Sequence, residues 1–206
     1  RFLGVPAEAL ICSMKQHQKY FHLVDASGAL LPYFITVSNI DSSDAQKVVD
    51  GNERVIRPRL TDAAFFFAQD KQSTLAAQRE RLRNIVFQTD LGSIWDKTER
   101  VAKLARTIGA ELGADPALCA RAAQLSKSDL VSEMVLEFDE LQGIMGSYYA
   151  LNDGEDPAVA QALTEQYLPR QAGDALAQGK VGIALALADR LDTLVGLVAA
   201  VLDREA

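Results

Sequence analysis

The first forty residues switch from helical to strand-like periodicity. Apolar residues at helical spacing predict a short helix over 7–18. Runs of aromatic and β-branched residues at 20–24 and 31–37 flank the turn-forming residues 25–28. Such runs on either side of a turn are typical of two paired strands. We therefore expect a β-hairpin directly after the first helix.

The pattern returns to helical spacing after the hairpin. Ser43 or Asp44 is expected to cap a long helix, because short polar side chains favour that position. Pro58 has no N–H to donate, so it should kink this helix or split it at Arg57. A further helix is predicted over 73–88.

From residue 93 onward the periodicity is helical throughout, with Gly, Asp and Pro at the breaks. Helices are predicted over 93–112, 116–137, 139–151, 156–167 and 174–202. The expected fold class is mainly α: a short N-terminal α/β part with a β-hairpin, followed by an all-α domain. We place the domain boundary near residue 90, which gives two domains, 1–90 and 91–206.

The net charge of −7 is distributed unevenly. Residues 1–46 hold 3 basic and 4 acidic side chains, residues 47–106 hold 12 and 8, and residues 107–206 hold 6 and 16. Polyanion binding depends on locally concentrated Lys and Arg. The middle segment is therefore the part expected to face a nucleic acid, and the C-terminal half is not expected to form a broad RNA platform.

The sequence predicts neither a membrane anchor nor a disulfide. The apolar run 181–202 is about as long as a membrane span, but Asp189, Arg190 and Asp192 interrupt it, so a buried core helix is expected. Two cysteines without short-range spacing fit a reducing cytoplasm. The first residues contain neither Met nor a basic leader, which favours an internal piece of a longer protein.

Seven segments along the chain carry a resemblance to one known family. They are GNERVIRPRL (51–60), LQGIMGSYY (141–149), HQKYF (17–21), FITVSNI (34–40), WDKTERV (95–101), KSDLVSEMV (127–135) and DRLDTLVG (189–196). In this order they resemble the β subunit of the tetrameric bacterial glycyl-tRNA synthetase.

That resemblance implies a function without a catalytic site in this piece. It implies binding and positioning of tRNA(Gly) for ATP-dependent glycylation by the α subunit, within an α2β2 tetramer in the cytoplasm. ATP and Mg would be used by the holoenzyme, and no cofactor would be bound by this fragment. DNA and membranes are not expected partners.

Three of the helical segments also resemble the HD superfamily of metal phosphohydrolases. Lys97 stands at the first His position, Ser128 and Asp129 stand at the His-Asp pair, and Asp189 stands at the last Asp. Both ligand histidines are therefore absent, and imidazole supplies the nitrogen ligands of such sites. The resemblance implies a degenerate, metal-free HD-like helical domain in which Lys97 pairs with Asp129 and Asp189. Alternatively, the aspartates only cap or hydrogen-bond neighbouring helices.

The segment MKQHQKYF supplies one group of candidate RNA-binding residues. Lys15, His17, Lys19 and Tyr20 bring positive charge and a stackable ring to the start of the hairpin. The alternative is an ordinary polar helix end that leads into a strand.

A second candidate group is Arg54, Arg57 and Arg59. Arg54 and Arg57 are three residues apart and share a helix face, so their guanidinium groups could meet neighbouring phosphates. The alternative is that these arginines tie the helix to carboxylates of the neighbouring module.

Two other groups are interpreted as structural. Arg79, Arg81 and Arg83 alternate on a predicted helix and are expected to point in different directions as a solvated face. Gly143 and Gly146 are three residues apart and are expected on one helix face, where they permit close packing.

Two rival functions remain open at this point. One is a surviving metal-dependent phosphohydrolase of the HD type, and the other is a helical interaction scaffold that does not bind RNA. The first predicts a bound divalent metal, and the second predicts no crosslinks to tRNA.

Overall fold

The computed structural model describes residues 2–39 and 41–205. Its strands and α-helices are, in chain order, α1 (Ala7–Gln18), β1 (Phe21–Val24), β2 (Leu30–Ile35), α2 (Ala45–Asp70), α3 (Leu75–Gln78), β3 (Val86–Gln88), β4 (Gly92–Ser93), α4 (Ile94–Glu111), α5 (Pro116–Leu125), α6 (Glu133–Glu137), α7 (Ile144–Asn152), α8 (Pro157–Glu165) and α9 (Lys180–Glu205). The prediction of a mainly α fold with an N-terminal hairpin is confirmed.

The N-terminal hairpin lies beside α1 and α2. β1 and β2 are antiparallel, with Phe21 opposite Ile35 and His22 opposite Phe34. One face of the hairpin packs on the helices, where a small core gathers the buried side chains Leu10, Met14, Tyr20 and Ile56. The predicted helix over 7–18 and the predicted hairpin are both present.

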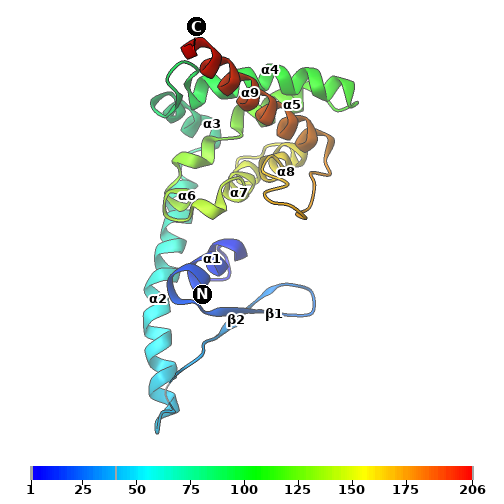
Figure 1. Ribbon diagram of the computed structural model, residues 1–206. Helices are drawn as coiled ribbons and strands as arrows, with labels where there is room; N and C mark the ends of the chain where they lie inside the picture. Colours follow the sequence, from blue (N-terminus) through cyan, green and yellow to red (C-terminus); the bar gives the residue numbers. More distant parts are fainter. Residues whose placement is uncertain (1, 40, 206) are drawn as a thin grey trace.

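α2 is a single helix of 26 residues that forms a long stalk in Figure 1. Asp44 caps its start by accepting a hydrogen bond from the Lys47 N–H. Of the two expected effects of Pro58, the split at Arg57 does not occur, because the helix continues through that residue. Pro58 is exposed, so the carbonyl that loses its intrahelical partner faces water, and one lost bond does not end the helix.

The predicted helix over 73–88 is also wrong. α3 has only four residues and is followed by a 3-10 helix at Arg79–Asn84. β3 then pairs with β4 in a small antiparallel hairpin, with Val86 opposite Ser93. The Gln88 side chain accepts hydrogen bonds from the backbone N–H groups of Asp90 and Leu91, which stabilises the turn. Such local side-chain bonds compete with helix formation.

The helical half is built from α4 to α9. The helix predicted over 116–137 is divided, because α5 ends at Leu125 and a 3-10 helix at Ser128–Val131 precedes α6. Ser132 caps α6 by accepting a hydrogen bond from the Val135 N–H. The predicted segment 139–151 is divided as well, because Gly143 has a φ of +80° and precedes α7.

The main hydrophobic core lies among α4, α5, α7, α8 and α9, and it extends into the N-terminal part. Its buried members include Ala9 and Cys12 of α1, Ala63 of α2 and Leu75 of α3. Residues from both sides of position 90 thus contribute to one core. The domain boundary near residue 90 stays a prediction.

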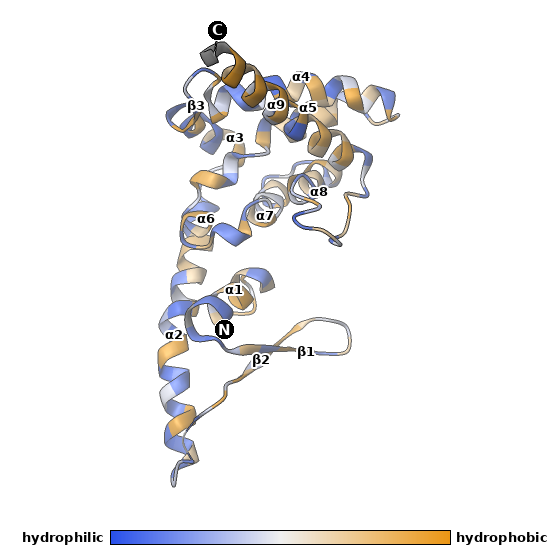
Figure 2. Cartoon of the chain, viewed as in Figure 1, coloured by the Kyte–Doolittle hydropathy of each residue, from blue (hydrophilic) through white to orange (hydrophobic). Residues whose placement is uncertain are grey.

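α9 matches the expectation of a buried helix only in its first half. Ala184, Leu185 and Ala188 are fully buried, whereas Leu194 is 62% exposed and Val195 is 65% exposed. Figure 2 shows this end of α9 as strongly hydrophobic. None of the helices within residues 2–39 and 41–205 has the length and apolar character needed to cross a membrane.

Candidate functional site

Two of the HD-like positions, Lys97 and Asp189, lie at the interface of α4 and α9, together with neighbouring charges. We call Lys97, Arg100, Lys127, Asp189 and Asp192 the ion cluster. The Lys97 Nζ lies 3.0 Å from Asp189 Oδ1 and 3.2 Å from Asp192 Oδ2. The Arg100 Nε lies 2.7 Å from Asp192 Oδ1. The expected ion pair between Lys97 and Asp189 is present, and Asp192 is a partner that sequence reasoning missed.

Lys127 brings a second ammonium group to Asp189. Its Nζ lies 3.4 Å from Asp189 Oδ2 and 4.3 Å from the centre of the Tyr167 ring. Burial lowers the pKa of Lys127. Burial opposes the charged form of Asp189, yet Lys127 and Lys97 hold the pKa of that carboxyl below its usual value. Lys97 on α4 and Lys127, which follows α5, therefore both compensate the negative charge of Asp189.

Asp129 is directed at the start of α7 instead of at Lys97. One of its carboxylate oxygens accepts hydrogen bonds from the Gly143 N–H at 2.5 Å and the Gly146 N–H at 3.1 Å. Burial raises the pKa of Asp129 to about 6, although both N–H groups act in the opposite direction. The expected contact between Lys97 and Asp129 is thus replaced by a helix cap, which is the alternative left open by the sequence.

This arrangement also corrects the interpretation of the two glycines. Gly143 lies before α7, not on its face, and a Cβ there would lie 2.6 Å from the Leu163 carbonyl oxygen. Gly146 lies within α7, and a Cβ there would lie 3.0 Å from the Asp129 carboxylate. Gly146 therefore lets the Asp129 carboxylate approach the helix backbone, whereas Gly143 lets the chain pass close to Leu163 and Tyr167.

The ion cluster does not fit a divalent metal. Ser128 is buried, and its hydroxyl offers no nitrogen ligand. Among the residues that the structure describes, no three His, Cys, Asp or Glu side chains form a group that could hold a metal ion. Lys97 and Lys127 already bring two positive charges to the Asp189 carboxylate and would repel a divalent cation there, so the charges favour ion pairs.

The first group of candidate RNA-binding residues is only partly exposed. Lys15 and Lys19 are exposed, and Lys19 ends α1 with a φ of +58°. Tyr20 is buried; its ring stacks on Phe34 at 4.7 Å, and its hydroxyl donates a 2.6 Å hydrogen bond to Asn52. Tyr20 therefore serves the small core and offers no free ring face. The side chain of His17 lies outside the described part of the structure.

The second group lies on the exposed surface of α2. Arg54 and Arg57 line a shallow groove that also contains carboxylates of the same helix, whereas Arg59 lies on a different face. Arg57 lies 3.7 Å from Glu53, one turn earlier. Within residues 2–39 and 41–205, no ion pair links these three arginines to another element. The groove brings two of the three predicted arginines together.

Much of the other positive charge in the middle segment is neutralised internally. The guanidinium groups of Arg79 and Arg83 each lie 3.6 Å from the centre of the Trp95 ring. They therefore share one partner instead of pointing in different directions, and they also pair with Glu99 and Glu80. Exposed cations without an ion pair in the described residues include Arg54, Arg59, Arg81, Lys103 and Arg106.

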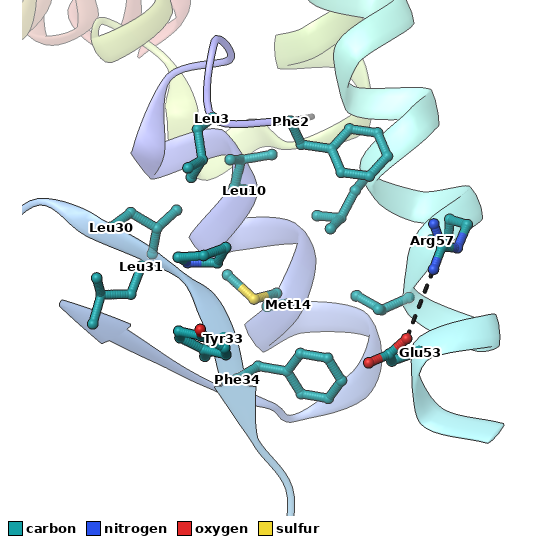
Figure 3. Close-up of a pocket in the computed structure, with 13 residues that line it drawn as sticks. Phe2, Leu3, Leu10, Met14, Leu30, Leu31, Tyr33, Phe34, Glu53 and Arg57 are labelled. Atoms are coloured by element: carbon teal, nitrogen blue, oxygen red, sulfur yellow. Dashed lines mark ion pairs between the residues drawn. The ribbon is translucent and has the colours of Figure 1, made fainter. Parts of the chain in front are cut away.

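A cavity that sequence reasoning missed lies between α1, β2 and α2 (Figure 3). We call it the α1–α2 cavity. It has a volume of about 250 Å³, and Glu53 and Arg57 lie at one side of it (Figure 3). Its apolar lining is Phe2, Leu3, Leu10, Met14, Leu30, Leu31, Pro32, Tyr33, Phe34, Ile56 and Leu60. The feature of the sequence that could have predicted this cavity is the number of aromatic residues in the hairpin, which exceeds what two strands can bury.

The comparisons with known proteins point to one family. A family model described as "Glycyl-tRNA synthetase beta subunit" matches residues 1–203. Proteins named "Glycine--tRNA ligase beta subunit" are 62% identical in Marinobacter nauticus and 60% identical in Hahella chejuensis, each over 197 residues. These matches cover 96% of this chain and 28% of each relative, so the chain spans little more than a quarter of their length.

The match therefore extends through the hairpin, α2 and the helical half alike. By this evidence, the chain belongs to the glycyl-tRNA synthetase β-subunit family.

Proposed function

We propose that this chain is the part of a glycyl-tRNA synthetase β subunit that helps to bind tRNA(Gly) and to position it for ATP-dependent glycylation by the α subunit. The observation that carries the proposal is the family match over residues 1–203. The chain works within an α2β2 tetramer in the cytoplasm. ATP and Mg are used by the holoenzyme, and this fragment contributes no catalytic site.

The exposed cations around α1 and α2 are the proposed RNA contacts. Arg54 and Arg57 support this role, because they share one groove and, within the residues that the structure describes, their only ion pair is the loose one between Arg57 and Glu53. Arg59, Lys15 and Lys19 add exposed charge on neighbouring surfaces. A guanidinium group can donate two parallel hydrogen bonds to a phosphate.

The HD-like region has a structural role in this proposal. Lys97 and Lys127 neutralise Asp189, and Asp129 caps α7, so these side chains hold α4, α7 and α9 together. A surviving phosphohydrolase would need these carboxylates for a metal. Adding Mn²⁺ to the purified chain should leave its melting temperature unchanged, and a metal-dependent rise would favour the phosphohydrolase.

The test uses the full-length β subunit assembled with its α subunit. Arg54→Ala and Arg57→Ala, singly and together, should weaken tRNA(Gly) binding. Each single substitution should reduce the magnitude of the slope of log affinity against log salt by about 1 or slightly less. Lys180→Ala is the control, because it removes one exposed cation from the acidic half. Unchanged affinity and slope in the double variant would overturn the assignment of these arginines.

A further inference from the structure

We propose that the α1–α2 cavity receives one unstacked nucleobase of the bound tRNA, and that this base carries an exocyclic amino group. The inference rests on the proposed function, since it takes tRNA as the ligand of this surface. It concerns a site separate from the phosphate contacts, because the cavity recognises a base and not the backbone.

The size of the cavity fits a single ring system. Its volume of about 250 Å³ lies below the range of about 300–1,000 Å³ in which proteins bind drug-sized molecules. A whole nucleotide would therefore leave its sugar and phosphate outside. Arg57 lines the cavity and is exposed to solvent, so these groups would lie beside it.

The walls of the cavity suit a flat aromatic ligand. Phe34 lines it from β2, and the stacking of its ring on Tyr20 at 4.7 Å holds it in place. Phe2 and Met14 lie on the facing walls in Figure 3. Stacking on aromatic rings is the common way in which proteins hold unpaired bases, and a thioether sulfur also contacts rings favourably.

The mouth of the cavity is complementary in charge to a nucleotide. Arg57 lines both the cavity and the α2 groove, so a phosphate attached to an inserted base would meet Arg57 and Arg54. Arg54 is exposed and forms no ion pair in the described residues. The groove also holds the carboxylates of Asp50, Glu53 and Asp62. The two guanidinium groups beside an apolar cavity are therefore the feature that favours a nucleotide over an apolar peptide side chain.

Glu53 adds a preference among the bases. Its Oε2 lies 3.7 Å from the Arg57 Nη2, which is longer than a hydrogen bond, so the carboxylate keeps its capacity to accept. A carboxylate accepts from the amino groups of adenine, cytosine or guanine, whereas the N3–H of uracil lies between two carbonyl oxygens that repel the carboxylate. The cavity should therefore prefer a base with an amino group to uracil.

Photocrosslinking tests the inference directly. A benzoylphenylalanine at Leu31, which lines the cavity, is introduced into the full-length β subunit assembled with its α subunit and tRNA(Gly). The expected product is a crosslink to an unpaired A, C or G. The same label at Val49, which is 49% exposed on α2 and does not line the cavity, is the control and should not give that crosslink. Crosslinks from position 31 only to protein would mean that another part of the polypeptide fills the cavity, and would overturn the inference.

Binding measurements separate this inference from the proposed function. Leu60→Phe adds volume at the wall of the cavity and should weaken tRNA binding on the order of tenfold, the effect of losing one stacked base. Because stacking releases no counterions, the salt slope should stay unchanged, unlike the slope in Arg54→Ala. Wild-type affinity in Leu60→Phe would overturn the base site, while wild-type affinity and an unchanged salt slope in the double arginine variant would overturn the RNA surface itself.

Discussion

The Tyr149 hydroxyl donates a 2.6 Å hydrogen bond to the Asp70 carboxylate, which joins the end of α2 to α7. The same carboxylate accepts hydrogen bonds from the backbone N–H groups of Glu133 and Met134 at the start of α6. One buried side chain thus connects the stalk to two helices of the helical half. Burial and Asp70 both raise the pKa of Tyr149, so its hydroxyl stays protonated and remains a donor.

Tyr149→Phe should lower the free energy of unfolding of the 206-residue chain by about 1.5–3 kcal/mol, the range for a hydrogen bond to a charged group. Urea unfolding measures this loss. Tyr148→Phe is the matched control, because the Tyr148 hydroxyl bonds to Glu8 at 2.9 Å in an exposed position. Tyr148→Phe should lower the free energy of unfolding by less than Tyr149→Phe does. Equal losses of free energy in the two variants would contradict the importance of the Asp70 contact.

Lys97→Ala should destabilise the chain by at most about 3–5 kcal/mol, because it leaves the partly buried Asp189 and the buried Asp192 with less compensation. Thermal and urea unfolding would show the effect. Lys103→Ala removes a charge from the exposed side of the same helix and should change stability by no more than about 0.5 kcal/mol. Similar stability of the two variants would mean that the ion cluster contributes nothing to the fold.

Gly143→Ala should be strongly destabilising. The residue has a φ of +80°, and a new Cβ would lie 2.6 Å from both the Leu163 carbonyl oxygen and the Tyr167 ring. Backbone strain alone costs about 1–3 kcal/mol. Gly51→Ala is the control inside α2, where a Cβ meets open space, and it should stabilise the chain by up to about 1 kcal/mol. The opposite signs of the two changes are the outcome to check by urea unfolding.

Asp129 makes the stability of the chain depend on pH. Its pKa is about 6 in the folded chain against an ordinary value of 3.8, so the folded state binds the proton more readily. The contribution of Asp129 to the free energy of unfolding is fully present below about pH 4 and is lost as the pH rises through about 6.

Asp129→Asn removes this titration and keeps an oxygen that can accept from Gly143 and Gly146. The stability of the wild type relative to this variant should therefore grow as the pH falls from 7 to 4. Urea unfolding at several pH values measures the difference. A difference that stays constant across this range would show that Asp129 does not titrate there.

The sequence predicted the elements whose signals are local. α1 and the first hairpin agree with the predictions because periodicity and turn residues act over a few positions. α4 agrees as well, and its start is fixed by a capping box between Ser93 and Asp96. Each of these features can be read without knowing what packs against it.

The predictions failed where side-chain contacts and strand pairing that the periodicity does not show decide the structure. The helix over 73–88 fails because the Gln88 side chain and the pairing of β3 with β4 compete with it. Asp129 was expected to pair with Lys97, but its carboxylate accepts hydrogen bonds from the N–H groups of Gly143 and Gly146 instead. The ring of Tyr20 was expected to be free to stack on a base. In the structure it stacks on Phe34, and its hydroxyl bonds to Asn52. The charge count of the middle segment did not reveal which cations are already paired.

The length of α2 gives the Asp70 junction a mechanical consequence. At 1.5 Å per residue, the 26 residues of this helix span about 39 Å, and Arg54 lies about 24 Å from Asp70 along its axis. A tilt of about 5° at the junction would therefore swing Arg54 sideways by about 2 Å. The contacts that Asp70 makes with α6 and α7 therefore help to set where Arg54, and any ligand bound to it, lies relative to the helical half.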